Sequence, residues 1–235
     1  MKDELELNKV VLVGRIYEEY AQYFDFKSLQ LEGQKILDMG AGVSSFCAEA
    51  HEKNYTVIAA ADPIYALPSP VLEKRCQADL INILSQLPKV MHNYQWQLYK
   101  NLEGLKAYRE KAYKKFLQDF VQNPTHYIAE SLPKLSFQND GFTLSLVSYL
   151  LFLYEDLFDY AFHRDSILEL SRVTSGELRI YPLIDYKGIR SRYLDKLLND
   201  ECCHHLDFEI RKVDFEFLNN ANEMLIVRKK NLIER

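Results

Sequence analysis

Hydrophobic and polar residues along this chain follow two different periods. Short apolar runs, typical of buried strands, occupy residues 34–39, 56–61, 126–129, 142–147 and 177–181. Apolar residues three or four positions apart, which indicate amphipathic helices, occur within residues 15–30, 44–53, 69–87, 105–122, 164–172 and 190–199. Strands and helices that alternate in this way predict a doubly wound parallel sheet with helices on both faces.

Near the C-terminus this rhythm changes to strict alternation. Residues 208–217 and 223–228 alternate apolar and polar positions, and the segment Asn-Asn-Ala-Asn at 219–222 joins them. Two such segments around a short polar connection predict a β-hairpin. We therefore expect an α/β fold: a doubly wound, Rossmann-like seven-stranded sheet with an antiparallel C-terminal hairpin.

The rhythm is also interrupted after the second strand. A crossover to the next parallel strand needs about a dozen residues, whereas residues 66–125 separate the second and third predicted strands. The segment carries two helical patterns, with an aromatic stretch from Tyr94 to Tyr99 between them, and the first pattern is expected to end at Pro88. We interpret 66–125 as a crossover helix plus a helical insertion, a candidate lid or substrate-binding subdomain. Residues 1–65 and 126–235 are predicted to form the main domain.

Composition limits the classes of function. The 235 residues are 48 % hydrophobic, which suits a packed core, and the net charge of −5 gives no global case for nucleic-acid binding. Basic residues of the second insertion helix alternate with acidic ones, which predicts an ordinary solvated helix face. These basic residues are Lys106, Arg109, Lys111, Lys114 and Lys115.

The N-terminal residues lack an apolar signal core, and no apolar run is long enough to cross a bilayer. Four cysteines form no disulfide framework, so we expect reduced thiols in a cytoplasmic protein. The run Cys202-Cys-His-His205 invites a metal interpretation. Because structural zinc usually takes two separated ligand pairs, we favour a helix end with buried cysteines and predict no metal.

The stretch Lys35-Ile-Leu-Asp-Met-Gly-Ala-Gly42 carries the clearest chemistry. A strand runs into Asp38 and then into Gly40-x-Gly42, a helix follows, and the next strand ends at Asp62. Glycines let the backbone approach a ligand closely, and a unit of this length is typical of adenosine-type cofactor sites. A plain strand-to-helix turn is the less favoured interpretation.

The residues favour one cofactor over another. A dinucleotide site requires a third glycine where this chain has Ser45. S-adenosylmethionine has no phosphate, and its ribose hydroxyls can donate hydrogen bonds to Asp62. A buried carboxylate at Asp38 can organise its cationic methionyl part. S-adenosylmethionine is therefore favoured over a nicotinamide cofactor.

The same residues resemble motifs I and II of the class I S-adenosylmethionine-dependent methyltransferases. Residues 129–137, 141–147 and 168–178 resemble further stretches of the type 11, quinone-biosynthesis-like subgroup, and the C-terminal hairpin fits that family's reversed seventh strand. The resemblance covers 9–65 and 126–230, and the insertion lies outside it. The sequence departs from the family pattern at Ser44, where a third glycine is usual, at Glu130, where aspartate is common, and at Thr174-Ser-Gly, which replaces Pro-Gly-Gly.

The resemblance implies S-adenosylmethionine as cofactor and S-adenosylhomocysteine as product. Carried over by position, Glu130 contacts the adenine amino group, and Ser131 and Leu132 flank the adenine ring. Ser148 and Tyr149 face the methyl-transfer centre. Arg15 and Tyr20 cover the methionyl end. The cofactor-binding set implied in this way is Arg15, Tyr20, Asp38, Gly40, Ala41, Gly42, Asp62, Pro63, Glu130, Ser131, Leu132 and Ser148.

The expected reaction is methyl transfer to a small-molecule acceptor. Such a displacement needs alignment more than a fixed catalytic group, so the catalytic residue stays open. Tyr149, Tyr154 and His163 are acceptor-side candidates, although helix-start packing explains His163 about as well. Ser148-Tyr-Leu-Leu151 differs from the Asn/Asp-Pro-Pro-aromatic run of the adenine-N6 and glutamine methyltransferases.

Other functions remain open. The chain could methylate tRNA or protein, with the insertion as docking surface. It could also be a non-catalytic S-adenosylmethionine binder whose insertion makes homodimer contacts. A basic stripe along 105–122 would favour a macromolecular acceptor, whereas a lid over a deep apolar pocket would favour a small one. A nicotinamide oxidoreductase is the least favoured, because of Ser45 and the hairpin.

Overall fold

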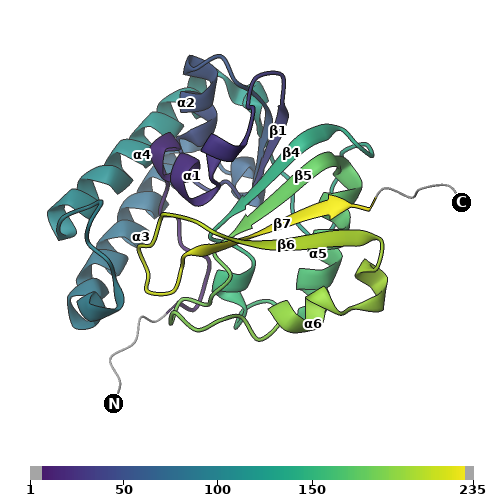
Figure 1. The fold of residues 1–235 in the computed structure, drawn as a ribbon. Coiled ribbons are helices and arrows are strands. Elements are labelled where there is room, and N and C mark those ends of the chain that lie inside the picture. Colours follow the sequence, from purple (N-terminus) through teal and green to yellow (C-terminus); the bar gives the residue numbers. More distant parts are fainter. Residues whose placement is uncertain (1–6, 231–235) are drawn as a thin grey trace, which may run out of the picture.

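The computed structural model describes residues 7–230, which form a mixed sheet between two layers of helices (Figure 1). The described strands lie in the order β3-β2-β1-β4-β5-β7-β6, and β7 runs antiparallel to both of its neighbours. The predicted fold class, a seven-stranded Rossmann-like sheet with an antiparallel C-terminal hairpin, is confirmed. The strands are β1 (Lys35–Met39), β2 (Thr56–Ala61), β3 (Tyr127–Ile128), β4 (Phe142–Ser148), β5 (Thr174–Tyr181), β6 (Leu206–Lys212) and β7 (Glu223–Lys229). The predicted domain bounds include residues 1–6 and 231–235, which lie outside the described residues.

Successive side chains of each strand point to opposite faces of the sheet, and each face buries its own apolar cluster. Ile36 packs with α1 to α4, whereas its neighbour Leu37 packs with α5 and α6. The helices are α1 (Tyr17–Tyr23), α2 (Phe46–Glu52), α3 (Ser69–Val90), α4 (Leu102–Gln122), α5 (Tyr160–Val173) and α6 (Leu194–Leu198). Short 3₁₀ helices are η1 (Phe26–Ser28), η2 (Pro63–Ala66), η3 (Met91–Asn93), η4 (Pro124–His126), η5 (Phe152–Tyr154) and η6 (Glu201–Cys203). Among these described helices, none combines the length and apolarity needed to span a membrane.

The long connection between β2 and β3 contains α3 and α4, which pack against each other on one face of the sheet (Figure 1). The Asn101 side chain accepts the Gly104 N–H at 2.8 Å and caps α4. The expectation that the first of these helices ends at Pro88 is wrong, because α3 continues to Val90. A proline in the last turn removes one hydrogen bond, and the burial of Leu87 and Val90 favours continuation.

The predicted hairpin strand 208–217 is too long. β6 ends at Lys212, because the chain then turns Phe217 into the apolar cluster beside the aromatic stretch of the insertion. The Gln95 N–H donates to the Phe217 carbonyl at 2.6 Å, and the Asn219 N–H donates to the Asn93 carbonyl at 2.9 Å. The connection between β6 and β7 therefore docks on the insertion.

The other element limits differ by a few residues. The first helix begins at Tyr17 rather than at about residue 15. α5 begins before the predicted residue 164, because the Asp159 side chain accepts the Phe162 N–H at 2.8 Å and caps the helix. β5 follows α5 without a loop. α6 is shorter than predicted, because an Ile184–Arg190 bridge closes a turn ahead of it.

Candidate functional site

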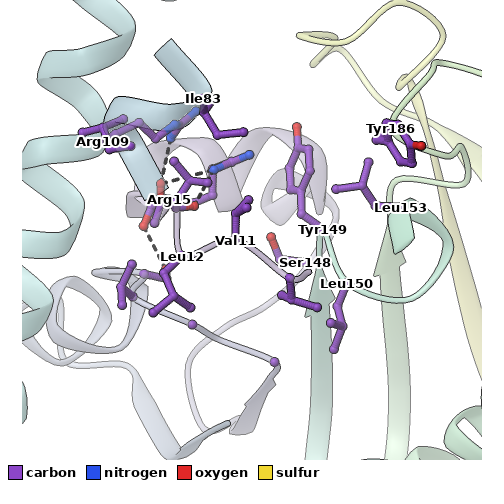
Figure 2. Close-up of a pocket in the computed structure, with 18 of the residues that line it drawn as sticks. Val11, Leu12, Arg15, Ile83, Arg109, Ser148, Tyr149, Leu150, Leu153 and Tyr186 are labelled. Atoms are coloured by element: carbon purple, nitrogen blue, oxygen red, sulfur yellow. Dashed lines mark hydrogen bonds between the residues drawn. The ribbon is translucent and has the colours of Figure 1, made fainter. Parts of the chain in front are cut away.

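A cavity lies at the carboxyl ends of β1, β2 and β4 (Figure 2). The chain order changes direction between β1 and β4, since β2 and β3 lie on one side of β1, and β4 and β5 on the other. Doubly wound sheets bind their ligands at such a point. The turn after β1, Asp62 after β2, and Ser148 and Tyr149 at the end of β4 all line this cavity.

The glycine turn presents its backbone to the cavity. Gly40 and Gly42 have φ of +68° and +56°, conformations that favour glycine. A Cβ on Gly40 would lie 2.4 Å from the Leu150 side chain, whereas a Cβ on Gly42 would meet no atom within 4 Å. The open space at Gly42 is therefore on the cavity side of the turn, where a ligand can approach the main chain.

The Asp62 carboxylate is fixed against this turn. One oxygen accepts the Gly42 N–H at 3.1 Å and the other accepts the Ile64 N–H at 3.0 Å, while the Tyr65 hydroxyl donates to the Gly42 carbonyl at 2.8 Å. Burial raises the pKa of Asp62, and the two backbone hydrogen bonds oppose that rise. Each carboxylate oxygen keeps a lone pair for a further donor.

Asp38 lies behind the cavity wall rather than in it. Its carboxyl group is fully buried, and the Tyr20 hydroxyl is 3.2 Å from both of its oxygens. Burial raises the pKa of Asp38 to about 8, which the Tyr20 hydrogen bond opposes and the charge of Asp62 reinforces. In the ligand-free protein this carboxyl group is therefore mostly protonated at neutral pH, and Tyr20 separates it from the cavity.

Arg15 and Tyr149 both line the cavity and lie against each other (Figure 2). The Arg15 guanidinium carbon is 4.2 Å from the centroid of the Tyr149 ring, and Nη1 donates to the Val13 carbonyl at 2.6 Å. Arg15 Nε and the Tyr149 hydroxyl are buried without a hydrogen-bond partner among the described residues. Tyr149 has a φ of +52°. Arg15 Nε lies 3.7 Å from a Glu19 carboxylate oxygen. Buried polar atoms are nearly always hydrogen-bonded, so the Tyr149 hydroxyl marks where a ligand atom can bind.

A buried charge network supports this side of the cavity. Glu19 is fully buried, accepts the Ile16 N–H at 2.9 Å and Arg109 Nη1 at 2.8 Å, and also accepts the Tyr99 hydroxyl. Arg109 donates to the Gly14 carbonyl at 2.9 Å as well. Burial by itself raises the pKa of Glu19, but the Arg109 charge and hydrogen bond outweigh it and lower the pKa.

The expectation that Arg109 belongs to a solvated helix face is wrong. Arg109 is only 2 % exposed, because it shares the buried face of α4 with Leu105, Ala112 and Phe116. The spacing of these positions is that of one helix face, so the sequence did carry a signal. Lys106, Lys111 and Lys114 are exposed, as expected for the other face.

The rest of the cavity wall is apolar and comes from separate segments. From the insertion it takes Leu80, Ile83, Leu84 and Leu87 of α3 and Leu105 of α4. From elsewhere it takes Leu150 and Leu153, which follow β4, and Phe217 and Leu218 of the β6–β7 connection. We call this part the apolar chamber.

Residues 7–13 close the apolar chamber from the N-terminal side. Asp79 of α3 holds this segment, since it accepts the Leu12 N–H at 2.9 Å and the Lys9 ammonium at 2.6 Å. At Gly14 the segment touches the glycine turn so closely that a Cβ would lie 2.2 Å from the Val43 carbonyl oxygen. The roles of Gly14, Glu19 and Asp79 were missed, because nothing local marks them.

Most of the predicted site residues converge on this one cavity. Those that line it are Arg15, Tyr20, Gly40, Ala41, Gly42, Asp62, Ser148, Tyr149 and Tyr154. Those outside its lining are Asp38, Pro63, Glu130, Ser131, Leu132 and His163.

Two of these outer residues have other partners. Glu130 accepts hydrogen bonds from the Ser136 N–H and hydroxyl. His163 is buried, and its Nδ1 and Nε2 lie 2.8 and 3.0 Å from the carbonyl oxygens of Asp159 and Leu151. Both of its ring nitrogens therefore face the main chain.

No family model matches the chain. The chain is 38 % identical over 226 residues to the uncharacterized protein MJ0045 of Methanocaldococcus jannaschii, covering 96 % of this chain and 99 % of that protein. Similar solved structures include a putative S-adenosylmethionine-dependent methyltransferase from Methanococcus maripaludis (TM-score 0.46, 10 % identity, 93 % of this chain and 87 % of that one). A second is an S-adenosylmethionine-dependent methyltransferase from Methanosarcina mazei, with a TM-score of 0.44 and 14 % identity. That match covers 88 % of this chain and 96 % of that one.

Proposed function

This chain belongs to the same protein family as MJ0045 of Methanocaldococcus jannaschii, and we propose that it is an S-adenosylmethionine-dependent methyltransferase with a small-molecule acceptor. One observation carries the proposal: the Gly40–Gly42 turn and Asp62 share a single cavity with the end of β4 and the apolar chamber. A donor site and an acceptor site are thus continuous, as direct transfer between two bound molecules requires.

The residues present fit the proposed cofactor. Asp62 keeps lone pairs for two ribose hydroxyls, and the open face of Gly42 admits a ligand next to the main chain. Arg15 lines the cavity together with Tyr20, and its positive charge suits a carboxylate at the methionyl end. Glu130, proposed for the adenine amino group, follows β3, whose Ile128 carbonyl accepts the Asp62 N–H at 3.1 Å, but it lies outside the cavity lining and accepts hydrogen bonds from Ser136.

Bound S-adenosylmethionine supplies a methyl group on a positively charged sulfur. The chain's own task is to align the acceptor, exclude water and leave the methyl path clear. Tyr149 follows β4 and has a hydroxyl without a partner, so we assign it to the acceptor side. Tyr154 also lines the cavity, but its hydroxyl already accepts the Val11 N–H at 3.2 Å.

The insertion favours a small acceptor over a macromolecule. Its helices turn leucines into the cavity, as a lid over an apolar pocket should. Several of its basic residues are paired with acids: Lys114 lies 3.0 Å from Glu110, and Lys115 lies 2.6 Å from Glu52. Pairing of this kind leaves little positive surface for nucleic acid.

The finer assignments stay predictions. The type 11, quinone-biosynthesis-like subgroup rests on the sequence stretches given above. Cytoplasmic location and a homodimer likewise remain to be tested.

Thermal unfolding with S-adenosylmethionine, S-adenosylhomocysteine and NAD tests the proposal. Ligand at one hundred times its dissociation constant stabilises a protein by about 2.7 kcal/mol, which raises the melting temperature of a chain of this size by roughly 5–11 °C. We expect both adenosyl ligands to give this shift. A shift with NAD alone, or with none of the three, would refute the proposed cofactor.

Asp62 provides the matched variants. Asp62→Ala should abolish the adenosyl-ligand shift, and Asp62→Asn, which keeps one acceptor oxygen, should retain part of it. Asp195→Ala serves as control, because that side chain is 81 % exposed and lies outside the cavity. Full binding by a folded Asp62→Ala protein would show that the cavity was assigned to the wrong ligand.

A further inference from the structure

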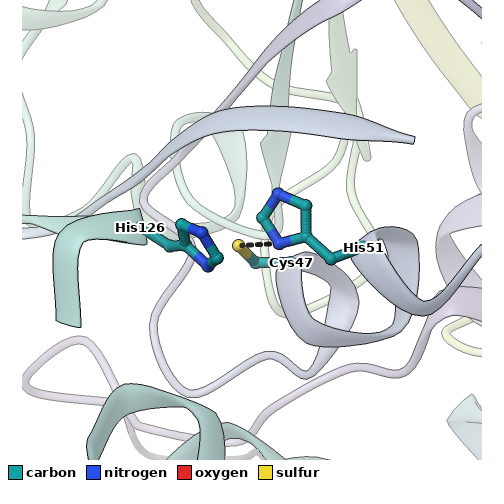
Figure 3. A group of neighbouring side chains, drawn as sticks. All are labelled: Cys47, His51 and His126. Atoms are coloured by element: carbon teal, nitrogen blue, oxygen red, sulfur yellow. Dashed lines mark hydrogen bonds between the residues drawn. The ribbon is translucent and has the colours of Figure 1, made fainter. Parts of the chain in front are cut away.

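A second group of side chains with ligand chemistry lies between α2 and η4 (Figure 3). Cys47 and His51 are one turn apart on α2, so they share a helix face. His126, the last residue of η4, approaches them from the segment that follows α4. One potential ligand atom from each residue lies within 4.8 Å of the other two.

The ring of His51 is already oriented for a ligand. Its Nε2 lies 3.1 Å from the Val57 carbonyl oxygen, so this nitrogen carries the proton. Nδ1 then presents a lone pair, and it is 3.8 Å from Cys47 Sγ. Metal-binding histidines commonly donate their second ring N–H to a backbone carbonyl in this way.

His126 packs against His51 and makes no hydrogen bond through Nδ1 within residues 7–230. Its ring centroid is 4.1 Å from that of His51, and its Nδ1 is buried without a hydrogen-bond partner among the described residues. The Asp119 carboxylate, which also accepts the Tyr127 hydroxyl, is 4.0 Å from that nitrogen. A thiol–imidazole hydrogen bond accounts for Cys47 and His51, but not for a second imidazole whose ring lies beside the first, tilted by 42°.

We propose that Cys47, His51 and His126 bind one Zn²⁺ ion, with the fourth position taken by solvent or by Asp119. A thiolate and two imidazoles are ligands that zinc prefers, whereas magnesium and calcium take oxygen ligands. Zinc bonds of about 2.0–2.3 Å place tetrahedral ligand atoms roughly 3.3–3.8 Å apart. The Cys47–His51 pair, at 3.8 Å, already meets this spacing, and the ligand atom of His126 lies within 4.8 Å of both.

The ion would bind a deprotonated sulfur. Burial, with the charges of Asp38 and Asp119 nearby, raises the pKa of the Cys47 thiol, so the free protein holds the proton. Formation of the zinc–sulfur bond releases that proton to solvent. Cys47 is 1 % exposed, while the His126 side chain is 32 % exposed and leaves a path for the ion.

The site is separate from the proposed methyl-transfer cavity, because none of the three residues lines it. A bound ion would join α2, which follows the glycine turn, to the chain that leaves the insertion. Its effect would thus be to hold these two segments together.

The test uses the full-length, tag-free protein after chelator treatment. Zn²⁺ is titrated against a chromophoric chelator, and Co²⁺ serves as a spectroscopic probe that shows a thiolate-to-cobalt absorption band when a cysteine binds it. We expect one equivalent of either metal. His126→Gln should weaken zinc binding by roughly tenfold or more, and Cys47→Ser should remove the cobalt–thiolate band.

Cys202→Ser and His204→Gln are the controls, because both residues are exposed and outside the group. They should bind metal as the wild type does. The proposal is overturned if the wild type binds no equivalent at micromolar metal, if Cys47→Ser keeps the band, or if the control variants lose it.

His126→Gln is the variant least disruptive to folding, because its side chain is partly exposed. Its melting temperature in chelator should equal that of the wild type in chelator, and its S-adenosylmethionine shift should be unchanged. Loss of metal binding with both properties intact separates this site from the proposed activity.

Discussion

Arg109→Leu tests how much the buried ion pair between Glu19 and Arg109 contributes to folding stability. The substitution removes the guanidinium from Glu19, which is fully buried and retains only the Ile16 N–H, the Tyr99 hydroxyl and, at 3.7 Å, Arg15. A buried carboxylate that loses its partner costs about 3–5 kcal/mol of folding stability. For a chain of this size the melting temperature should fall by roughly 6–20 °C.

The loss of folding stability in Arg109→Leu should depend on pH, because the Glu19 carboxyl group can take up a proton. Arg109 lowers the pKa of Glu19 below its ordinary value of 4.5, so the pair contributes fully above that pH and less as the pH falls through the folded-state pKa. In Arg109→Leu the carboxyl group can escape its penalty by taking up a proton. The difference in unfolding free energy between wild type and variant should therefore be smaller at pH 4 than at pH 7.

Urea unfolding at the two pH values measures this difference. Trp96 is the single tryptophan and packs on Phe217 at 5.5 Å, so its fluorescence reports the loss of the fold. The double variant Glu19→Gln/Arg109→Leu removes both charges but keeps an acceptor for the Ile16 N–H. It should regain at least half of the lost stability. A single-variant cost below about 1 kcal/mol, or one equal at both pH values, would refute the reasoning.

Two further predictions concern the buried polar groups of the cavity wall. Asp38 has a folded-state pKa of about 8 against an ordinary value of 3.8, so the folded protein binds the extra proton between these values and wild-type stability falls as the pH rises. Asp38→Asn cannot titrate, and its urea-unfolding stability relative to wild type should increase by about 1.4 kcal/mol per pH unit from pH 5.5 to 7; a constant difference would contradict this. Tyr149→Phe removes a hydroxyl without a hydrogen-bond partner among the described residues, so the unfolding free energy and the affinity for S-adenosylmethionine should stay nearly unchanged. Tyr20→Phe removes the hydrogen bond to Asp38 and should lower the unfolding free energy by about 1–3 kcal/mol. Equal losses in the two tyrosine variants would count against the assignment of Tyr149 to an acceptor.

The sheet could be predicted because each of its parts carries a local signal. The glycine turn needs two residues at positive φ, and the strand before it needs an unbroken apolar run. Asp62 ends the second run. Parallel strands bring their carboxyl ends to one edge, so Asp62 and the turn had to meet there.

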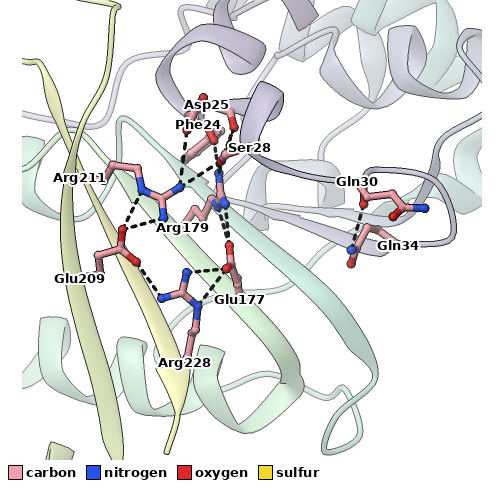
Figure 4. Close-up of polar contacts among 10 residues, drawn as sticks. All are labelled: Phe24, Asp25, Ser28, Gln30, Gln34, Glu177, Arg179, Glu209, Arg211 and Arg228. Carbon is pink, nitrogen blue, oxygen red and sulfur yellow. Dashed lines mark hydrogen bonds and ion pairs between the residues drawn. The ribbon is translucent and has the colours of Figure 1, made fainter.

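Contacts between distant segments could not be predicted in this way. Arg179 lies in β5 two residues after Glu177, on the same face of the strand, but its contact with the chain after α1 has no signal in the sequence. In the structure it is 1 % exposed, donates to Glu177 at 2.8 and 2.7 Å and reaches the Phe24 carbonyl after α1 (Figure 4). Glu177 in turn pairs with Arg228 of β7, which also reaches Glu209 of β6 (Figure 4).

The candidate zinc group shows the same limit. The spacing of Cys47 and His51 is visible in the sequence, and a predicted helix places them on one face. His126 is far away along the chain, and only the packing of η4 beside α2 brings it to them. The run 202–205 attracted attention because its residues are adjacent, yet Cys202 is exposed while Cys203 is buried.

The apolar chamber has a consequence for how this family can diverge. The glycine turn and Asp62 follow β1 and β2, whereas most of the chamber is built from residues 7–13, the insertion and the β6–β7 connection, with Leu150 and Leu153 after β4. Substitutions in those three segments can reshape the chamber without touching the donor side. Under the proposed function, descendants of one ancestor can change the acceptor they recognise while each keeps the residues proposed for the methyl donor.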